Sequence, residues 1–231
     1  SSAETVSGSF DSDTAYLAFS LFIDEINTIK TSLNNLTDRG GLTTDAGPLA
    51  GDPVASYFKN QLSSIVNAPI PGFDEEEIYL AYFGFETQQD GSFVVNEDTF
   101  KDYFEANPAH FSAFFNSRVS TDSALISASM IGDNYTAGIY SFVLDDNGNG
   151  SIGNTSLTNT GNIYSSHSGD VSGLLLTTQT GADDTTLYVG RSLLDTLSSF
   201  TSQILSTSGD IAEKVSDLNT SLLDYQDDVV A

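Results

Sequence analysis

The 231-residue chain contains no cysteine and no tryptophan, and only 7 of its residues are lysine or arginine. Without cysteine, disulfides, thiol nucleophiles and cysteine-ligated zinc sites are excluded. The 32 aspartates and glutamates leave a formal net charge of −25. Nucleic acids and anionic membrane surfaces attract positive patches, so this balance argues against both as partners. No apolar run approaches the ~20 residues of a membrane-spanning helix, so membrane insertion is not expected.

Two interpretations of the acidic excess remain open: a solubility trait of a surface protein, or cation binding by carboxylates. The candidate cation site is Asp-Asp-Asn-Gly-Asn-Gly at residues 145–150, where Asp145, Asn147 and Asn149 occupy ligand positions of a calcium-binding loop. The position that needs a bidentate glutamate holds Ser156, and the flanking residues are typical of strands. A hairpin turn is therefore the preferred prediction, and we assign no metal and no cofactor.

The clearest element is a long amphipathic helix, predicted over residues 13–38, with Ser12 or Asp13 as its N-cap and Gly40 at its end. Because an isolated helix of this kind is marginal in water, it needs a partner. Its apolar residues follow steps of three and four, the spacing of a helix-packing seam. This first seam consists of Phe19, Phe22, Ile26, Ile29, Leu33 and Leu36.

A second seam with the same spacing lies near the other end of the chain and is the predicted partner of the first. Its flanking positions are mostly small or uncharged, which favours packing into a helical bundle over a two-stranded homodimeric coil. A further helix is predicted over residues 192–205. The second seam consists of Ile211, Val215, Leu218, Leu222, Tyr225 and Val229.

Shorter elements are predicted between the two seams. Asp52 followed by Pro53 predicts a helix over residues 53–66, and Asn96 opens another helix. Asn107-Pro108 starts a third helix, which carries phenylalanines that we interpret as core residues. Segments 78–87 and 92–95 are predicted strands of a hairpin that turns at Asp90-Gly91. Residues 139–144, 174–178 and 185–189 are predicted strands of one small antiparallel sheet.

The expected fold class is therefore α+β. An elongated helical bundle or coiled coil, formed by the N- and C-terminal helices, would hold β-hairpins and a small antiparallel sheet between them. We expect one main helical-bundle domain over residues 1–231, with a small β subdomain at residues 135–190.

The two histidines are the remaining candidates for acid–base chemistry. His110 follows Pro108 in a short helix and is interpreted as a surface or rim residue. His167 lies among serines, but a catalytic triad needs an orienting carboxylate and an oxyanion hole, and no nucleophile-elbow motif is present. We therefore expect no catalytic residue and no enzyme activity.

One stretch carries a family resemblance: Ala-Gly-Pro-Leu-Ala-Gly-Asp, from Ala46 to Asp52, between the first two predicted helices. It is followed by Gly84-Phe85, by the Asp90-Gly91 turn and by the Asn107-Pro108 pair with its phenylalanine-ending helix. Gly-Arg-Ser-Leu at residues 190–193 and a last long helix complete the series. In this order the features resemble the C-terminal region of the flagellar filament-capping protein, the FliD-type member of the hook-associated family.

The resemblance implies a secreted structural protein, located outside the cell at the tip of the bacterial flagellar filament. Its partners would be other copies of itself in a homo-oligomeric cap, flagellin, and the hook–filament junction proteins. Such a cap guides exported flagellin subunits into the growing filament and makes or breaks no bond. From residue chemistry alone, an acidic extracellular adhesin or a calcium-dependent binding module is the alternative.

Overall fold

The computed structural model describes residues 11–205, and within this range the chain is α+β, as predicted. These residues form two compact units. The first comprises residues 11–23 and 67–193, and the second comprises residues 24–66 and 194–205. Helix α1, Ser12–Thr37, contributes residues to both units. The predicted pairing of this helix with the second seam falls on residues outside the described range, so the elongated bundle stays a prediction.

Helix α1 begins one residue earlier than predicted, and its N-cap is Asp11. The Asp11 carboxylate accepts the backbone N–H groups of Asp13 and Thr14 at 3.1 and 3.3 Å. The prediction of Ser12 or Asp13 as the cap was wrong, because both residues already lie inside the first helical turn. At the other end, the predicted stop is confirmed: the helix ends at Thr37, and Gly40 adopts a left-handed φ of 72°.

The second unit contains two further helices, α2 (Pro53–Asn67) and most of α5 (Leu193–Leu205). The predicted N-cap of α2 is confirmed, since Asp52 Oδ1 accepts the N–H groups of Val54 and Ala55. The rings of Phe58 on α2 and Phe200 on α5 stack with centroids 5.2 Å apart. Offset or stacked rings at this distance stabilise the contact between two helices beyond simple burial.

The part of the first unit that follows α2 begins with short helices and a hairpin. The strand predicted over residues 78–87 was wrong for Leu80–Phe83, which is a 3-10 helix, η1. Leu80 and Phe83 are both buried, and the three-residue period of a 3-10 helix places them on one side. The hairpin itself is confirmed, with β1 and β2 joined through Asp90-Gly91. The elements in order are β1 (Phe85–Thr87), β2 (Phe93–Val95), α3 (Glu97–Ala106), α4 (Pro108–Phe111) and η2 (Ser112–Phe114).

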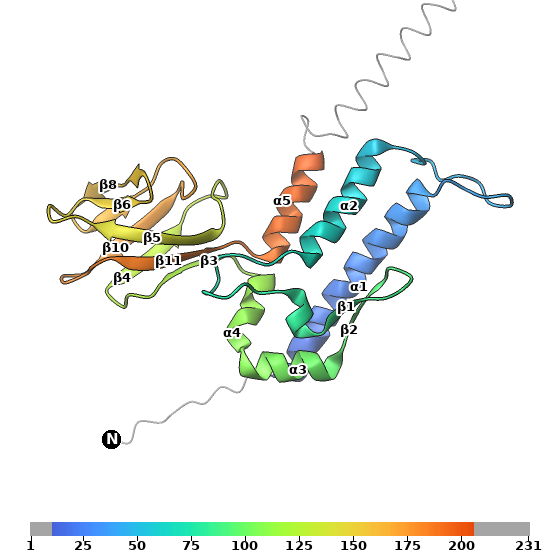
Figure 1. The fold of residues 1–231 in the computed structure, drawn as a ribbon, viewed down its shortest axis with the longest axis horizontal. Helices are drawn as coiled ribbons and strands as arrows, with labels where there is room; N and C mark the ends of the chain where they lie inside the picture. The colour runs from blue at the N-terminus through green and yellow to red at the C-terminus, as the bar shows by residue number, and fades with distance from the viewer. Residues whose placement is uncertain (1–10, 206–231) are drawn as a thin grey trace, which may run out of the picture. The chain divides into compact units, whose positions relative to one another are not determined.

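Residues 118–190 form two antiparallel sheets packed face to face, not the one small sheet that was predicted (Figure 1). The four-stranded sheet has the order β4-β10-β9-β8, and the five-stranded sheet has the order β3-β11-β5-β6-β7. The sequence pointed to β5, β10 and β11 because these strands carry long apolar runs. The others are short and rich in serine and threonine. The strands are β3 (Arg118–Thr121), β4 (Ile126–Met130), β5 (Gly138–Leu144), β6 (Gly150–Ile152), β7 (Thr155–Ser156), β8 (Thr158–Thr160), β9 (Ile163–Ser165), β10 (Leu174–Thr178) and β11 (Thr185–Gly190).

The core of this β-sandwich comes from alternate residues of both sheets. Phe142 on β5, Leu187 on β11 and Leu174 and Leu176 on β10 are fully buried. A strand turns successive side chains to opposite faces, so the residues between them point away from the core. The sandwich therefore presents two outer faces, one on each sheet.

A loop over residues 71–77 lies against one end of β11. At Gly72, which has a φ of 79°, an added Cβ would lie 2.1 Å from the carbonyl oxygen of Val189. The next residue, Phe73, packs its ring over Gly190, and the Arg118 guanidinium lies 5.4 Å above that ring. Arg118 also donates to the Phe73 carbonyl oxygen at 3.2 Å. Glycine is therefore required where loop and strand meet.

Candidate assembly surfaces

The six residues of the first seam all lie on α1, but their environments differ along the helix. Phe19 and Ile26 are buried, and Phe22 and Leu33 are half-buried. Ile29 and Leu36, by contrast, are 45% and 37% exposed. The residues of the second seam, from Ile211 to Val229, lie outside the described residues.

The buried stripe of α1 includes a residue that the sequence analysis missed. Ile23 is 1% exposed and lies four residues after Phe19 and three before Ile26. Its spacing would have allowed its identification, since 19-23-26 is as regular a helical pattern as 19-22-26. Because residues 22 and 23 are both apolar, periodicity alone did not decide which of them is buried with Phe19 and Ile26.

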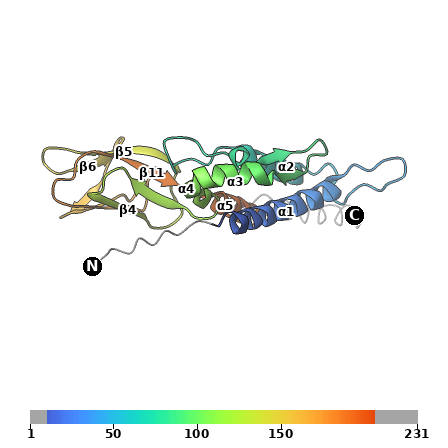
Figure 2. The ribbon, with the colours of Figure 1, turned by 90° about the horizontal axis from the view of Figure 1, so that it is seen from below.

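Phe19 is anchored in a cluster of aromatic rings. Its ring centroid lies 4.8 Å from that of Phe114, 5.4 Å from Phe100, 6.1 Å from Phe83 and 6.4 Å from Phe111. Phe19, Phe83, Phe100 and Phe114 are fully buried. Of the phenylalanines interpreted as core residues after Asn107-Pro108, Phe114 is confirmed, whereas Phe111 and Phe115 are half-buried. Both views of the ribbon show α3, the source of Phe100, beside the first half of α1 (Figures 1 and 2). The cluster fixes this half of α1.

The Ala46–Asp52 stretch connects α1 and α2 through backbone hydrogen bonds. The N–H of Leu49 donates to the Leu36 carbonyl, and the N–H of Gly47 donates to the Asp38 carbonyl, both at 2.8 Å. These bonds satisfy carbonyl groups that the end of a helix leaves without an intrahelical partner. At Gly47 an added Cβ would lie 2.3 Å from the Asn35 carbonyl oxygen, so only glycine allows this approach. The stretch thus closes one helix, while its last residue, Asp52, caps the next.

The loop before this stretch presents a leucine to solvent. Leu42 is 107% exposed, although its loop is held by a hydrogen bond from Gly41 N–H to the Thr44 carbonyl oxygen. Asp38 Oδ1 accepts the N–H of Gly40 at the base of the same loop. A single exposed leucine is common on protein surfaces, so Leu42 alone does not mark a contact surface.

Asp145, Asn147 and Asn149 form the turn between β5 and β6, which confirms the hairpin prediction. Asp145 Oδ1 accepts the N–H groups of Asn147 and Asn149 at 2.9 and 2.8 Å, and Oδ2 accepts the Asn149 side-chain amide at 2.8 Å. The side-chain bond from Asn149 and these backbone bonds lower the pKa of Asp145 below its usual value. Its carboxylate therefore serves the turn. The part of the chain that the structure describes contains no cluster of three potential ligands.

The two histidines have different surroundings. His110 Nε2 lies 3.0 Å from Asp74 Oδ2, and Nδ1 lies 3.0 Å from the Tyr103 hydroxyl. The hydrogen bond from His110 holds the pKa of Asp74 below its usual value, against a smaller effect of burial. His167 is exposed and lies 3.2 Å from the Ser165 hydroxyl. Among these hydrogen bonds, His110 joins a tyrosine hydroxyl to a carboxylate and His167 contacts a serine, so neither is a serine–histidine–aspartate triad.

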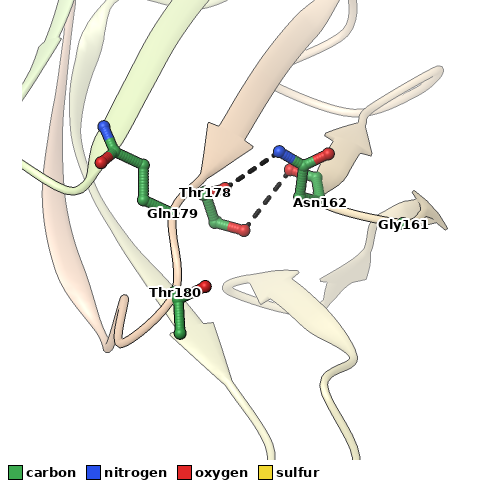
Figure 3. A pocket seen from close by; sticks show the side chains of 5 residues that line it. All are labelled: Gly161, Asn162, Thr178, Gln179 and Thr180. Carbon is green, nitrogen blue, oxygen red and sulfur yellow. Dashed lines mark hydrogen bonds between the residues drawn. The ribbon is translucent and has the colours of Figure 1, made fainter.

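An open pocket of about 670 Å³ lies at the end of β9 and β10 in the sandwich. Its lining is uncharged: Gly161, Asn162, Thr178, Gln179 and Thr180. Figure 3 shows Asn162 and Thr178 joined across it, with the Asn162 amide donating to the Thr178 carbonyl at 3.1 Å. The Thr178 hydroxyl donates back to the Asn162 carbonyl at 3.4 Å. The lining contains no acid–base group.

The comparison with protein families assigns the whole chain. The family described as flagellar hook-associated protein 2 C-terminus matches residues 1–231. The chain belongs to this family. No curated protein and no solved structure matches it. The resemblance seen in the sequence, to the C-terminal region of a FliD-type cap protein, is thereby confirmed.

For a flagellar hook-associated protein, the arrangement of residues fits a structural role. The stretch that carried the resemblance, Ala46–Asp52, is a connector whose backbone closes α1 and whose aspartate caps α2. Among the described residues, no helix is both long and apolar enough to cross a bilayer. The features that the sequence analysis missed are Ile23 and the two outer faces of the sandwich.

Proposed function

We propose that this chain is the C-terminal part of a cap subunit that oligomerises at the tip of the flagellar filament and promotes flagellin polymerisation. The observation that carries the proposal is the match of the hook-associated protein 2 family to residues 1–231. The proposed partners are further copies of the subunit, flagellin and the hook–filament junction proteins. The proposed location is extracellular, at the filament tip.

The proposed action is mechanical. Subunits of the cap would move relative to one another to open one insertion site at a time for an incoming flagellin. Two features support a scaffold: the buried aromatic cluster that fixes the first half of α1, and the apolar residues left at the surface of its second half. Neither histidine of the described residues belongs to a serine–histidine–aspartate triad, and the pocket lining carries no acid–base group, which fits a protein that performs no covalent chemistry.

Deletion of the gene for the parent protein tests this function. We expect the deletion strain to release flagellin monomers into the medium and to assemble no long filaments, and a plasmid copy of the gene to restore both. Normal filaments and normal motility in the deletion strain would refute the proposal.

We further propose that the exposed end of the first seam packs against the second seam. Ile29 and Leu36 are partly exposed on α1, and Leu218 is central in the second seam. A charge placed in an apolar contact has no partner, so Ile29→Asp and Leu218→Asp should each lower the melting temperature. If the two residues share one contact, the double variant should lose less than the sum of the single losses.

The control for this cycle is Thr31→Asp, which places the same charge at an exposed polar position of α1. We expect Thr31→Asp to change the melting temperature little. In a double variant with Leu218→Asp, the two losses of melting temperature should simply add. Full additivity of Ile29→Asp with Leu218→Asp would show that the two seams do not pack together.

A further inference from the structure

The outer face of the four-stranded sheet is uncharged and rich in hydroxyl groups. The strand registers place its residues in two rows across the sheet, one through Ser127 and Thr177 and the other through Ser129 and Leu175. Six of its eight residues are exposed, including Ile163 at 45%. We call this the four-stranded face; it consists of Ser127, Ser129, Thr158, Thr160, Ile163, Ser165, Leu175 and Thr177.

The other sheet has an outer face of the same character over β5, β6 and β7, whereas its β3 and β11 side carries Arg118 and the buried Tyr188. On its central strand, β5, Ile139 and Val143 are 48% and 40% exposed, on either side of the exposed Ser141. The registers bring hydroxyl-bearing residues of the neighbouring strands to the same side. We call the part beyond the buried Tyr188 the five-stranded face; it consists of Ile139, Ser141, Val143, Ser151, Ser156 and Thr186.

The carboxylates of the sandwich lie in its connections, and one of them, Asp122, accepts a hydrogen bond from the Tyr188 hydroxyl at 3.3 Å on the β11 side of the five-stranded face. Every acidic residue between 118 and 190 lies in a connection between strands, and no residue of the four-stranded sheet is charged. Edge strands of natural sheets usually carry a charge or a proline that blocks pairing with another chain, and the edges β4 and β8 carry neither. The acidic residues in these connections are Asp122, Asp133, Asp145, Asp146, Asp170, Asp183 and Asp184.

The charge of the chain decides which surfaces of two copies can meet. At a net charge of −25, copies repel one another wherever carboxylates face carboxylates. The strands of the four-stranded face, and β5, β6 and β7 of the five-stranded face, carry no carboxylate, so this repulsion is least there. Both faces also expose isoleucine or valine among hydroxyls, and burial of these side chains is favourable.

We propose that the four-stranded face of one copy binds the five-stranded face of the next. Contact between two different faces is heterologous, so it closes a ring when the rotation between copies is suitable. A contact between identical faces would instead stop at a pair. The proposal rests on the proposed function, since it specifies how neighbouring subunits of the oligomer meet.

The area of the contact is small. Four strands spaced by about 4.8 Å, with two rows of residues, offer only a few hundred Å² per copy. A stable isolated pair buries about 800 Å² per partner. The contact is therefore weak by itself and adds to others within an oligomer, where neighbours are already held close.

Cysteine cross-linking tests the proposal cleanly because the chain has no cysteine of its own. Thr177→Cys places a thiol on the four-stranded face, and Ser141→Cys places one on the five-stranded face. Each variant of the parent protein is purified, allowed to oligomerise and oxidised, alone and as an equimolar mixture. We expect a disulfide-linked dimer in the mixture and only monomers from each variant alone. A chain with both substitutions should give a ladder of multimers.

An added charge in the contact provides a second test. Thr177→Asp should reduce the cross-linking between Ser129→Cys on one copy and Ser141→Cys on the next, because it places a carboxylate in the contact. The matched control is Ser198→Asp, which adds the same charge at an exposed position of α5 and should leave cross-linking unchanged. Dimers from Thr177→Cys alone, or monomers only in the mixture, would overturn the proposal.

These outcomes are separate from the test of the cap function. If oligomers form but the mixture gives no disulfide, this contact is refuted and the cap function stands. If the deletion strain makes normal filaments while the mixture still cross-links, the contact stands and the cap function is refuted.

Discussion

Replacement of Phe19 by alanine tests the central packing argument. The Phe19 ring is fully buried and lies within 6.4 Å, centroid to centroid, of four other phenylalanine rings. Replacing a buried phenylalanine by alanine costs about 3–5 kcal/mol, because apolar contacts are lost and a cavity remains. The lost ring–ring contacts place Phe19→Ala near the upper end of that range.

In a domain of 150–250 residues, each kcal/mol shifts the melting temperature by about 2–4 °C. Phe19→Ala should therefore lower the melting temperature by roughly 10 °C or more. Thermal unfolding is followed by near-ultraviolet circular dichroism, which reports the packing of aromatic rings. If the alanine variant does not fold, Phe19→Leu keeps most of the apolar volume and should show a smaller loss.

The control is Leu42→Ala, since Leu42 is fully exposed at the tip of its loop. Surface substitutions of this kind change stability by about 0.5 kcal/mol or less. A shift for Phe19→Ala no larger than that of Leu42→Ala would show that Phe19 is not the anchor of α1, and the packing described for the first unit would be wrong.

Three further predictions follow from local geometry. Gly47→Ala should cost at least about 1–3 kcal/mol in a urea titration, because its Cβ meets the Asn35 carbonyl, whereas Gly41→Ala should be nearly neutral. Asp74→Asn should cost ~0.2–1 kcal/mol at neutral pH. The Asp74 pKa is lowered in the folded chain, so its contribution is present above the ordinary value of 3.8 and lost as the pH falls through the folded pKa. The difference from the parent chain should thus vanish in strong acid; a constant difference would contradict this. Asp145→Ala should lower the melting temperature equally with and without calcium, since its carboxylate holds the turn; a loss seen only with calcium would favour the calcium-binding alternative.

Much of the helical part of the fold could be predicted from the sequence, because its signals are local. Asp52-Pro53 and Asn96 mark helix starts through hydrogen bonds to the next two or three residues, and the structure contains both. The Asp90-Gly91 turn is local in the same sense. At the N-cap of α1, several neighbouring side chains can accept the first helix N–H groups. Local signals therefore locate the start of the helix only to within one or two residues.

The sandwich was harder to predict because its pairing is non-local. β3 pairs with β11 from the other end of the segment, and β4 pairs with β10. Strands such as β8, Thr158–Thr160, have no apolar alternation, and their neighbours alone make them strands. The packing of Gly72 and Phe73 on β11 depends on a contact across more than a hundred residues, so no local pattern contains it.

Prediction of the candidate site from the sequence was limited in the same way, as the residues of the first seam show. Periodicity identified α1 and its apolar character, but not which apolar residues the chain buries within itself. Phe19 finds its partners in the segment from Phe83 to Phe114. The residues that remain exposed, such as Ile29, could be recognised only once these partners were in place.

The aromatic cluster also sets the order in which the chain can fold. If the chain leaves a ribosome or a narrow channel from its N-terminus, Phe19 has no ring to pack against until Phe83 has emerged, and the cluster is complete only after Phe114. Contacts separated by so many residues form slowly, because a long loop must close first. The first half of α1 would therefore stay without its aromatic partners while about a hundred residues pass, which keeps this part of the chain threadable until Phe114 is outside.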